Sequence, residues 1–174
     1  MGIFIRGSLR LLVFAGSLLA GMQVPSYLAQ YESRVDAHLL EVTNNLSGFQ
    51  GTANQLFNGN IEALIVYYEQ SNDPVFERDA NSIRGIYNRY LLLTREQFAV
   101  NAPWYYSVIH MLFSADHELR TETLSGYSYS VPLDRAALEW GFGFAILVTL
   151  LLELLVSICR RLFAGTHRRR QELI

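Results

Sequence analysis

The chain has 174 residues, of which 51% are hydrophobic and 17% are charged, and its formal net charge is −2. With a slightly positive mean hydropathy, this composition suits neither a disordered tail nor an ordinary water-soluble domain. All 14 basic residues are arginines, and the stretch from Tyr31 to Arg135 holds seven of them against 13 acidic residues, so a nucleic-acid-binding surface is not expected there.

Two apolar stretches near the ends of the chain, Leu11–Val24 and Ala136–Phe163, predict two membrane spans. Arginines lie at the end of each stretch nearer the chain terminus, or beyond that end: Arg6, Arg10, Arg160, Arg161, Arg168, Arg169 and Arg170. The positive-inside rule then places both termini in the cytoplasm. A cut after Ala20 would leave the bulky Leu18 three positions before the cleavage site, so we expect an uncleaved anchor rather than a signal peptide.

These features predict an all-α protein, a two-span transmembrane hairpin with an extramembrane bundle of about three to four helices. Residues 1–25 are expected to form the first transmembrane helix with a short cytoplasmic N-terminus, 26–135 an external helical domain, 136–163 the second transmembrane helix and 164–174 a basic cytoplasmic tail. The tail could touch anionic lipid.

The first part of the external domain is predicted as two helices. Apolar residues at seven-residue intervals from Leu28 to Leu56 predict a helix after Pro25, which could be continuous with the first span. Asn58-Gly59-Asn60 is a strong break. A second helix is expected from Ile61 to about Gln70.

Two further helices are predicted before the second span. Asp73 is a good N-cap and Pro74 suits a first helical turn, so a third helix is expected from there to about Val100. A fourth, aromatic helix is predicted from Trp104 to about Leu119, and Ser125–Val131 is predicted as an extended connector.

Arg10 and Glu153 are predicted to lie at similar depth in the two spans. They are 15 residues inward from Pro25 and 13 inward from Trp140, which corresponds to about 22 and 20 Å of helix. Pairing is favoured because an isolated charge in hydrocarbon costs several kcal/mol. The pair could act as a proton or ion relay or a docking contact, or it could lock the two helices or snorkel to the inner interface.

Small residues on both spans predict close helix packing. They are Gly16, Ser17, Ala20 and Gly21 on the first span and Gly141 and Gly143 on the second. The partner of these faces could be the other span, a second copy of the chain or a different protein.

Aromatic residues gather in the predicted external domain. Trp104, Tyr105 and Tyr106 form a possible partner surface together with other tyrosines, because tyrosine is favoured at interfaces. The other tyrosines are Tyr67, Tyr68, Tyr87 and Tyr90. Packing in the core and at the membrane interface is the alternative role of the cluster.

The sequence predicts no catalytic residue, no cofactor site and no metal site. His110 and His117 are seven residues apart on one predicted helix, which is about 10 Å and too far for a shared metal. His117 and Asp116 could meet His38, but structural roles are favoured for these histidines. No known catalytic or phosphate-binding motif occurs, and the single Cys159 excludes an intrachain disulfide.

The sequence resembles an uncharacterised family of bacterial inner-membrane proteins, a domain-of-unknown-function family with two helices flanking an external helical domain. The segments that carry this resemblance are Gln23-Val24-Pro25, Tyr31, His38, Gly48-Phe49, Asp73-Pro74-Val75-Phe76, Trp104 and Trp140-Gly141. The resemblance implies a Gram-negative inner membrane, so that residues 26–135 would be periplasmic. It implies no known activity.

The expected function is that of a non-enzymatic accessory, scaffold or assembly subunit of a larger membrane complex. Its expected partners are membrane lipids and other membrane protein subunits or a second copy of the chain, without nucleic acid. One alternative is a homo-oligomeric channel or transporter component that uses Arg10 or Glu153. Another is a periplasmic binder of lipid or a small molecule.

Overall fold

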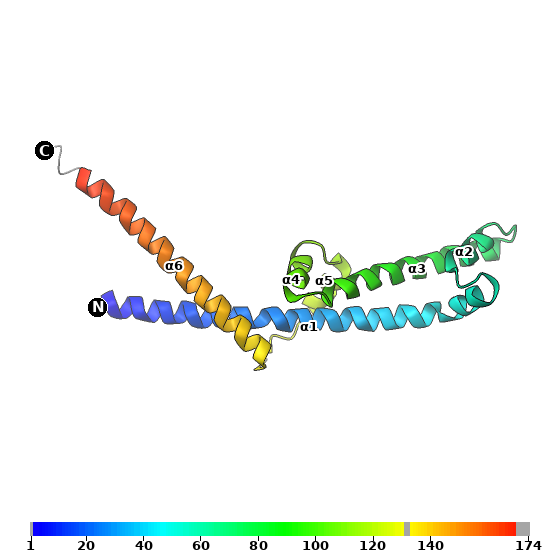
Figure 1. The fold of residues 1–174 in the computed structure, drawn as a ribbon, viewed down its shortest axis with the longest axis horizontal. Helices are drawn as coiled ribbons and strands as arrows, with labels where there is room; N and C mark the ends of the chain where they lie inside the picture. Colours follow the sequence, from blue (N-terminus) through cyan, green and yellow to red (C-terminus); the bar gives the residue numbers. More distant parts are fainter. Residues whose placement is uncertain (1, 131–132, 170–174) are drawn as a thin grey trace. The chain divides into compact units, whose positions relative to one another are not determined.

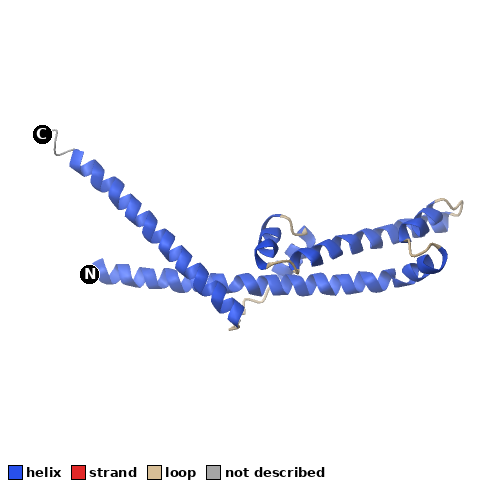
Figure 2. Cartoon of the chain, in the orientation of Figure 1, coloured by secondary structure: helices blue, strands red, loops and turns tan. Residues whose placement is uncertain are grey.

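The computed structural model describes residues 2–130 and 133–169, and Figure 1 and Figure 2 show their helical fold. The helices are α1 (Gly2–Leu56), α2 (Ile61–Glu69), α3 (Pro74–Val100), α4 (Trp104–Phe113), α5 (His117–Ser125) and α6 (Arg135–Arg169). No strand occurs within the described residues, which confirms the all-α prediction. The last part of the predicted tail, residues 170–174, and the end of the predicted connector, residue 131, lie outside them.

The chain divides into two compact units. The helix-pair unit comprises residues 1–27 and 128–174, and the central unit comprises residues 28–127. Helix α1 contributes to both units because it runs without interruption through Pro25. The helix after Pro25 is therefore continuous with the first predicted span, as the sequence allowed.

The end of α1 depends on the predicted Asn-Gly break. Asn58 and Gly59 have φ angles of 52° and 82° and therefore lie in the left-handed region, which cannot continue a right-handed helix. Asn60 then caps α2, because its side chain accepts a hydrogen bond from the backbone N–H of Ala63 at 3.1 Å.

Three helices form one apolar core cluster of the central unit. Leu46 and Ala53 of α1 pack with residues of α2 and with Ile83 of α3. The α2 members are Ile61, Leu64 and Ile65. Helix α3 begins as predicted, with Pro74 in its first turn and the Asp73 side chain accepting a hydrogen bond from Val75 N–H at 2.9 Å.

Helix α3 runs antiparallel to α1 within the central unit (Figure 1). Near its C-terminal end, Gln97 donates a 2.9 Å hydrogen bond to Asp36, which lies early in this part of α1. Near its N-terminal end, Ile83 packs with Leu46, which lies later in α1. This pairing brings distant parts of the sequence together at one end of the unit.

The prediction of one helix from Trp104 to about Leu119 is wrong, because two helices, α4 and α5, form there. The backbone N–H groups of Ser114 and Ala115 both bond the carbonyl oxygen of His110, which closes α4. The Asp116 side chain then accepts a hydrogen bond from Leu119 N–H at 3.1 Å and caps α5. Capping therefore overrides the continuous apolar pattern.

Segments of α1 and α6, within Gly7–Leu56 and Arg135–Cys159, are long and apolar enough to cross a membrane. In the most apolar stretch of each segment, only 11% and 6%, respectively, is buried inside the structure. The core helix of a water-soluble domain would instead be largely covered by other parts of the chain.

Candidate functional site

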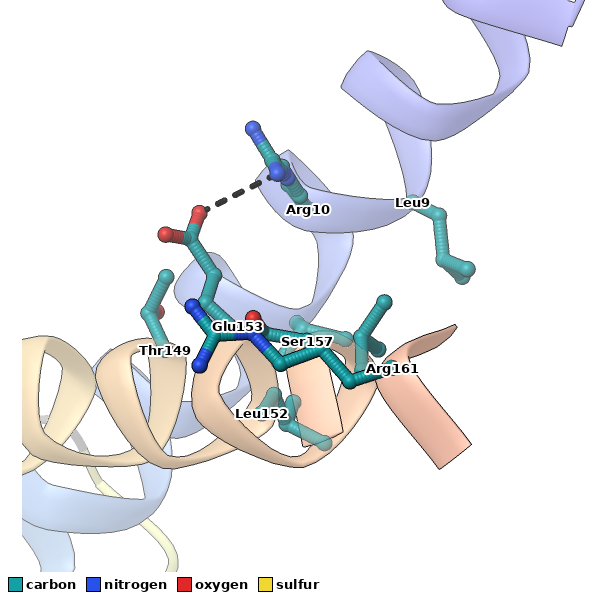
Figure 3. A pocket seen from close by; sticks show the side chains of 9 residues that line it. Leu9, Arg10, Thr149, Leu152, Glu153, Ser157 and Arg161 are labelled. Atoms are coloured by element: carbon teal, nitrogen blue, oxygen red, sulfur yellow. Dashed lines mark ion pairs between the residues drawn. The ribbon is translucent and has the colours of Figure 1, made fainter. Parts of the chain in front are cut away.

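Arg10 of α1 and Glu153 of α6 form an ion pair in the helix-pair unit. Arg10 Nη2 lies 3.3 Å from Glu153 Oε1, as Figure 3 shows. The two side chains are 68% and 47% exposed, so the described residues leave much of the pair uncovered. In a hydrocarbon environment such a pair is costly unless further polar groups contact it.

The ion pair lies in a cleft of about 790 Å³ (Figure 3). The residues that line it are Leu9, Arg10 and Val13 of α1 and Thr149, Leu152, Glu153, Val156, Ser157 and Arg161 of α6. The polar residues of α6 recur at every fourth position and therefore share one helical face. Among these α6 residues, only Glu153 was predicted as a site residue. The four-residue spacing in the sequence is the pattern that could have identified Thr149, Ser157 and Arg161 as well.

Gly21 and Gly141 lie where the backbones of α1 and α6 approach closely. A Cβ atom on Gly21 would lie 2.9 Å from the carbonyl oxygen of Trp140, and one on Gly141 would lie 3.0 Å from that of Leu18. Both distances are shorter than an ordinary carbon–oxygen contact. Glycine at these two positions therefore permits the approach.

The other predicted packing residues take little part in this contact. A Cβ on Gly16 or Gly143 would have nothing within 4 Å, Ala20 is exposed and Ser17 is half-buried. On α6 the buried small residues at four-residue spacing are Ala137, Gly141 and Ala145. The i, i+4 spacing in the sequence was the signal for the two alanines, which the prediction missed.

The aromatic residues at the start of α4 are exposed. Trp104, Tyr105 and Tyr106 are 65%, 55% and 49% exposed, and the Trp104 and Tyr105 rings are edge-on at a centroid distance of 5.8 Å. Further exposed apolar residues of this helix are Ile109, Leu112 and Phe113. Since α4 contains no Asp, Glu, Lys or Arg, these residues form one uncharged apolar face, here called the α4 face.

The other predicted aromatic residues separate from this face. Tyr68, Tyr87 and Tyr90 pack against the core of the central unit. Tyr67 is 63% exposed and its ring lies 5.6 Å from that of Phe57. The aromatic residues that the sequence predicted as one cluster therefore form two groups. The first group is exposed at the start of α4, and most of the second group, the tyrosines of α2 and α3, packs against the core.

A buried polar network that the sequence did not predict joins α1, α3 and α4. The Tyr31 hydroxyl donates a 2.7 Å hydrogen bond to Glu96 Oε2, and His110 Nε2 lies 2.8 Å from the same oxygen. Tyr31 is fully buried and Glu96 is 7% exposed. Burial raises the pKa of Tyr31 above its ordinary value, and the hydrogen bond to Glu96 and the charge of Glu96 raise this pKa further.

A second polar network joins α1 to α5. Glu122 accepts a 2.7 Å hydrogen bond from Arg34 Nη1, and His38 Nε2 lies 2.8 Å from its other oxygen. The hydrogen bond to His38 is the main reason that the pKa of Glu122 is lowered, and the charges of His38 and Arg34 lower it further, while burial opposes the change.

The structure does not form the histidine contacts that the sequence left open as alternatives to structural roles. His110 and His117 are on separate helices, α4 and α5, rather than on one face of one helix. His38 bonds Glu122 rather than Asp116 or His117. Among the described residues, no three His, Cys, Asp or Glu side chains are grouped so that they could hold a metal ion.

Comparison with known proteins places the chain in a family. No curated protein and no solved structure matches the chain. The sequence profile of the family described as "Protein of unknown function (DUF2937)" matches residues 5–165, which include the whole central unit and most of the helix-pair unit. Because this match covers most of the chain, the protein belongs to the DUF2937 family.

Proposed function

We propose that this protein is a two-span inner-membrane protein that acts as a non-enzymatic accessory or assembly subunit of a larger membrane complex, with the α4 face as its contact surface for a protein partner. The observation that carries the proposal is the exposure of large apolar side chains along a helix without charge. The membrane spans would anchor the central unit, and the α4 face would recognise the partner.

The membrane part of the proposal is supported by α1 and α6. Each has a segment long and apolar enough to cross, and each segment is largely unburied. Arginines lie at the end of each segment that is nearer the chain terminus, so the positive-inside rule favours cytoplasmic termini. Residues 26–135 would then lie in the periplasm of a Gram-negative cell.

The α4 face has the composition of a protein interface. Interface cores are enriched in Tyr, Trp and Phe and depleted of charged residues, and the outward residues of α4 follow this pattern. Contiguous exposed apolar patches larger than a few hundred Å² mark interaction sites. Leu112 and Phe113, 61% and 81% exposed, extend the face beyond its aromatic start.

Helix α4 is fixed from its inner side, so the α4 face is presented in one orientation. The buried Ser107 hydroxyl donates to the carbonyl oxygen of Ala99 at 3.1 Å, and His110 bonds Glu96. Met111 is also buried. A surface that is already ordered loses less conformational entropy when a partner binds.

The acid–base groups of the central unit support a binding role over a catalytic one. Glu96 is engaged by Tyr31 and His110, and Glu122 by Arg34 and His38. Each network joins helices that are distant in sequence, which is what a structural cross-link does. These carboxyl groups thus serve to hold α4 and α5 against α1.

Affinity purification of the full chain from native membranes tests the proposal. We expect a reproducible membrane-protein partner that Leu112→Asp releases, because the substitution puts a charge into the α4 face. Leu40→Asp is the matched control, since Leu40 of α1 is 65% exposed, like Leu112 at 61%, but lies outside α4. Recovery of the wild-type chain as a monomer alone would contradict the proposal, as would equal loss of the partner with both variants.

A further inference from the structure

The cleft around Arg10 and Glu153 is amphipathic. Among the described residues, the charged groups that line it are two guanidinium groups, from Arg10 and Arg161, and one carboxyl group, from Glu153, so these three groups carry one excess positive charge. Its apolar wall residues are Leu9, Val13, Leu152 and Val156. A ligand that fits this lining has an anionic head and hydrocarbon chains.

The polar groups of the cleft are ordered along α6. Thr149, Glu153, Ser157 and Arg161 follow one another at about 6 Å per four residues. Figure 3 shows Ser157 and Arg161 on the same side of α6 as Glu153. Arg161 lies 21 residues after Trp140, which is about 31 Å of helix and close to the thickness of the hydrocarbon layer. Arg161 would therefore reach the headgroups of the cytoplasmic leaflet.

The exposure of the ion pair means that no other described residue covers it fully. Arg10 and Glu153 are 68% and 47% exposed in their side chains, although both lie within the proposed spans. A phosphate group gives guanidinium groups the charge-assisted hydrogen bonds that hydrocarbon cannot. Basic clefts between membrane helices on the cytoplasmic side are known to bind anionic lipid headgroups.

We propose that this cleft binds one anionic phospholipid of the cytoplasmic leaflet. Arg161 and Arg10 bind its phosphate, Ser157 lies beside the headgroup, and the acyl chains run along Val13, Leu152 and Val156. The volume of about 790 Å³ lies within the range of about 300–1,000 Å³ that ligand sites occupy. The inference rests on the proposed membrane spans, but it does not depend on the partner of the α4 face.

Native mass spectrometry of the purified full chain tests the site. The protein is delipidated in mild detergent and given equal amounts of phosphatidylglycerol and phosphatidylcholine. We expect one phosphatidylglycerol per chain, retained about tenfold more than phosphatidylcholine, because the choline ammonium of the latter cancels the charge of its phosphate. Arg161→Gln should lose most of this preference. Arg135→Gln is the matched control, because Arg135 lies at the other end of α6 and is 93% exposed.

A second variant and a competitor complete the experiment. Leu152→Trp fills the apolar part of the cleft without removing a charge and is expected to lower phosphatidylglycerol retention as well. Excess glycerol 3-phosphate is expected to displace little lipid, since it lacks acyl chains. Circular dichroism shows whether each variant is folded. If Arg161→Gln does not fold, the lipid retention of Leu152→Trp tests the site instead.

Three results would overturn the lipid site. They are equal retention of the two lipids by the wild-type chain, equal effects of the Arg161 and Arg135 substitutions, and full competition by glycerol 3-phosphate. None of them bears on the α4 face, because the assay contains no protein partner. Conversely, loss of a partner from the Leu112→Asp variant leaves the lipid assay unchanged.

Discussion

The Tyr31 hydroxyl donates a 2.7 Å hydrogen bond to the buried carboxyl group of Glu96, which lies 65 residues later in the chain. The same carboxyl oxygen meets His110, so one acceptor connects α1, α3 and α4. This connection fixes the helix that carries the exposed aromatic residues. Its loss should therefore weaken the whole central unit.

Tyr31→Phe is expected to destabilise the protein by about 1–2 kcal/mol, because it removes a donor to a buried acceptor without leaving a large cavity. Urea unfolding of the full chain in detergent, followed by circular dichroism, measures the change. Tyr67→Phe is the control, since Tyr67 is 63% exposed, and its effect should stay within about 0.5 kcal/mol. Equal effects of the two substitutions would show that the buried hydrogen bond contributes no stability.

The lowered pKa of Glu122 predicts a loss of stability in acid. A carboxyl group whose pKa is lower in the folded protein stabilises the fold above its unfolded value of 4.5, and this contribution disappears as the pH falls through the folded pKa. Glu122→Gln should therefore be less stable than the wild-type protein at neutral pH, and the difference should shrink below that value. Unfolding curves over this range that keep a constant difference would contradict the assignment.

Gly141→Ala should destabilise the contact of α1 with α6, because its new Cβ would meet the carbonyl oxygen of Leu18 at 3.0 Å. A cost of about 1–3 kcal/mol is expected from overpacking. Gly143→Ala is the matched control, since its Cβ meets nothing within 4 Å and both changes alter helix propensity alike. Unfolding by titration with sodium dodecyl sulfate compares the two. A Gly141→Ala protein as stable as Gly143→Ala would exclude the close backbone approach.

Arg10 and Glu153 should be energetically coupled. In a double-mutant cycle with Arg10→Gln and Glu153→Gln, each single change leaves one charge without its partner, so the double variant should be more stable than the sum of the single effects predicts, by about 1 kcal/mol. The same detergent titration gives the four stabilities. Additive effects would mean that both side chains reach the aqueous interface separately.

The sequence predicted those parts of the fold that local patterns encode. The start of α3 follows from Asp73 as its cap, and the break between α1 and α2 follows from Asn58-Gly59-Asn60. The Asn60 cap of α2 was not predicted. The division between α4 and α5 was missed because the apolar pattern continues across it. There, a helix start capped by Asp116 competes with continuation of the preceding helix, and the relative free energies of these two alternatives determine which one forms.

The polar networks of the central unit could not be predicted in this way. The separations between Tyr31, Glu96 and His110 in the sequence match no known motif. These residues meet only because α3 folds back along α1 and α4 follows α3. The cleft in the helix-pair unit was partly predictable. Its polar residues on α6 recur every fourth position, whereas the pairing of Glu153 with Arg10 needed an argument from depth in the membrane.

Site-specific photocrosslinking in native membranes tests the proposed contact surface most directly. A photoreactive amino acid replaces Ile109, 56% exposed on the α4 face, and in a second variant Leu40, 65% exposed on α1. We expect a discrete crosslink to one membrane protein from position 109 and none from position 40. No crosslink from position 109, or the same products from both positions, would contradict the α4 face as a partner surface.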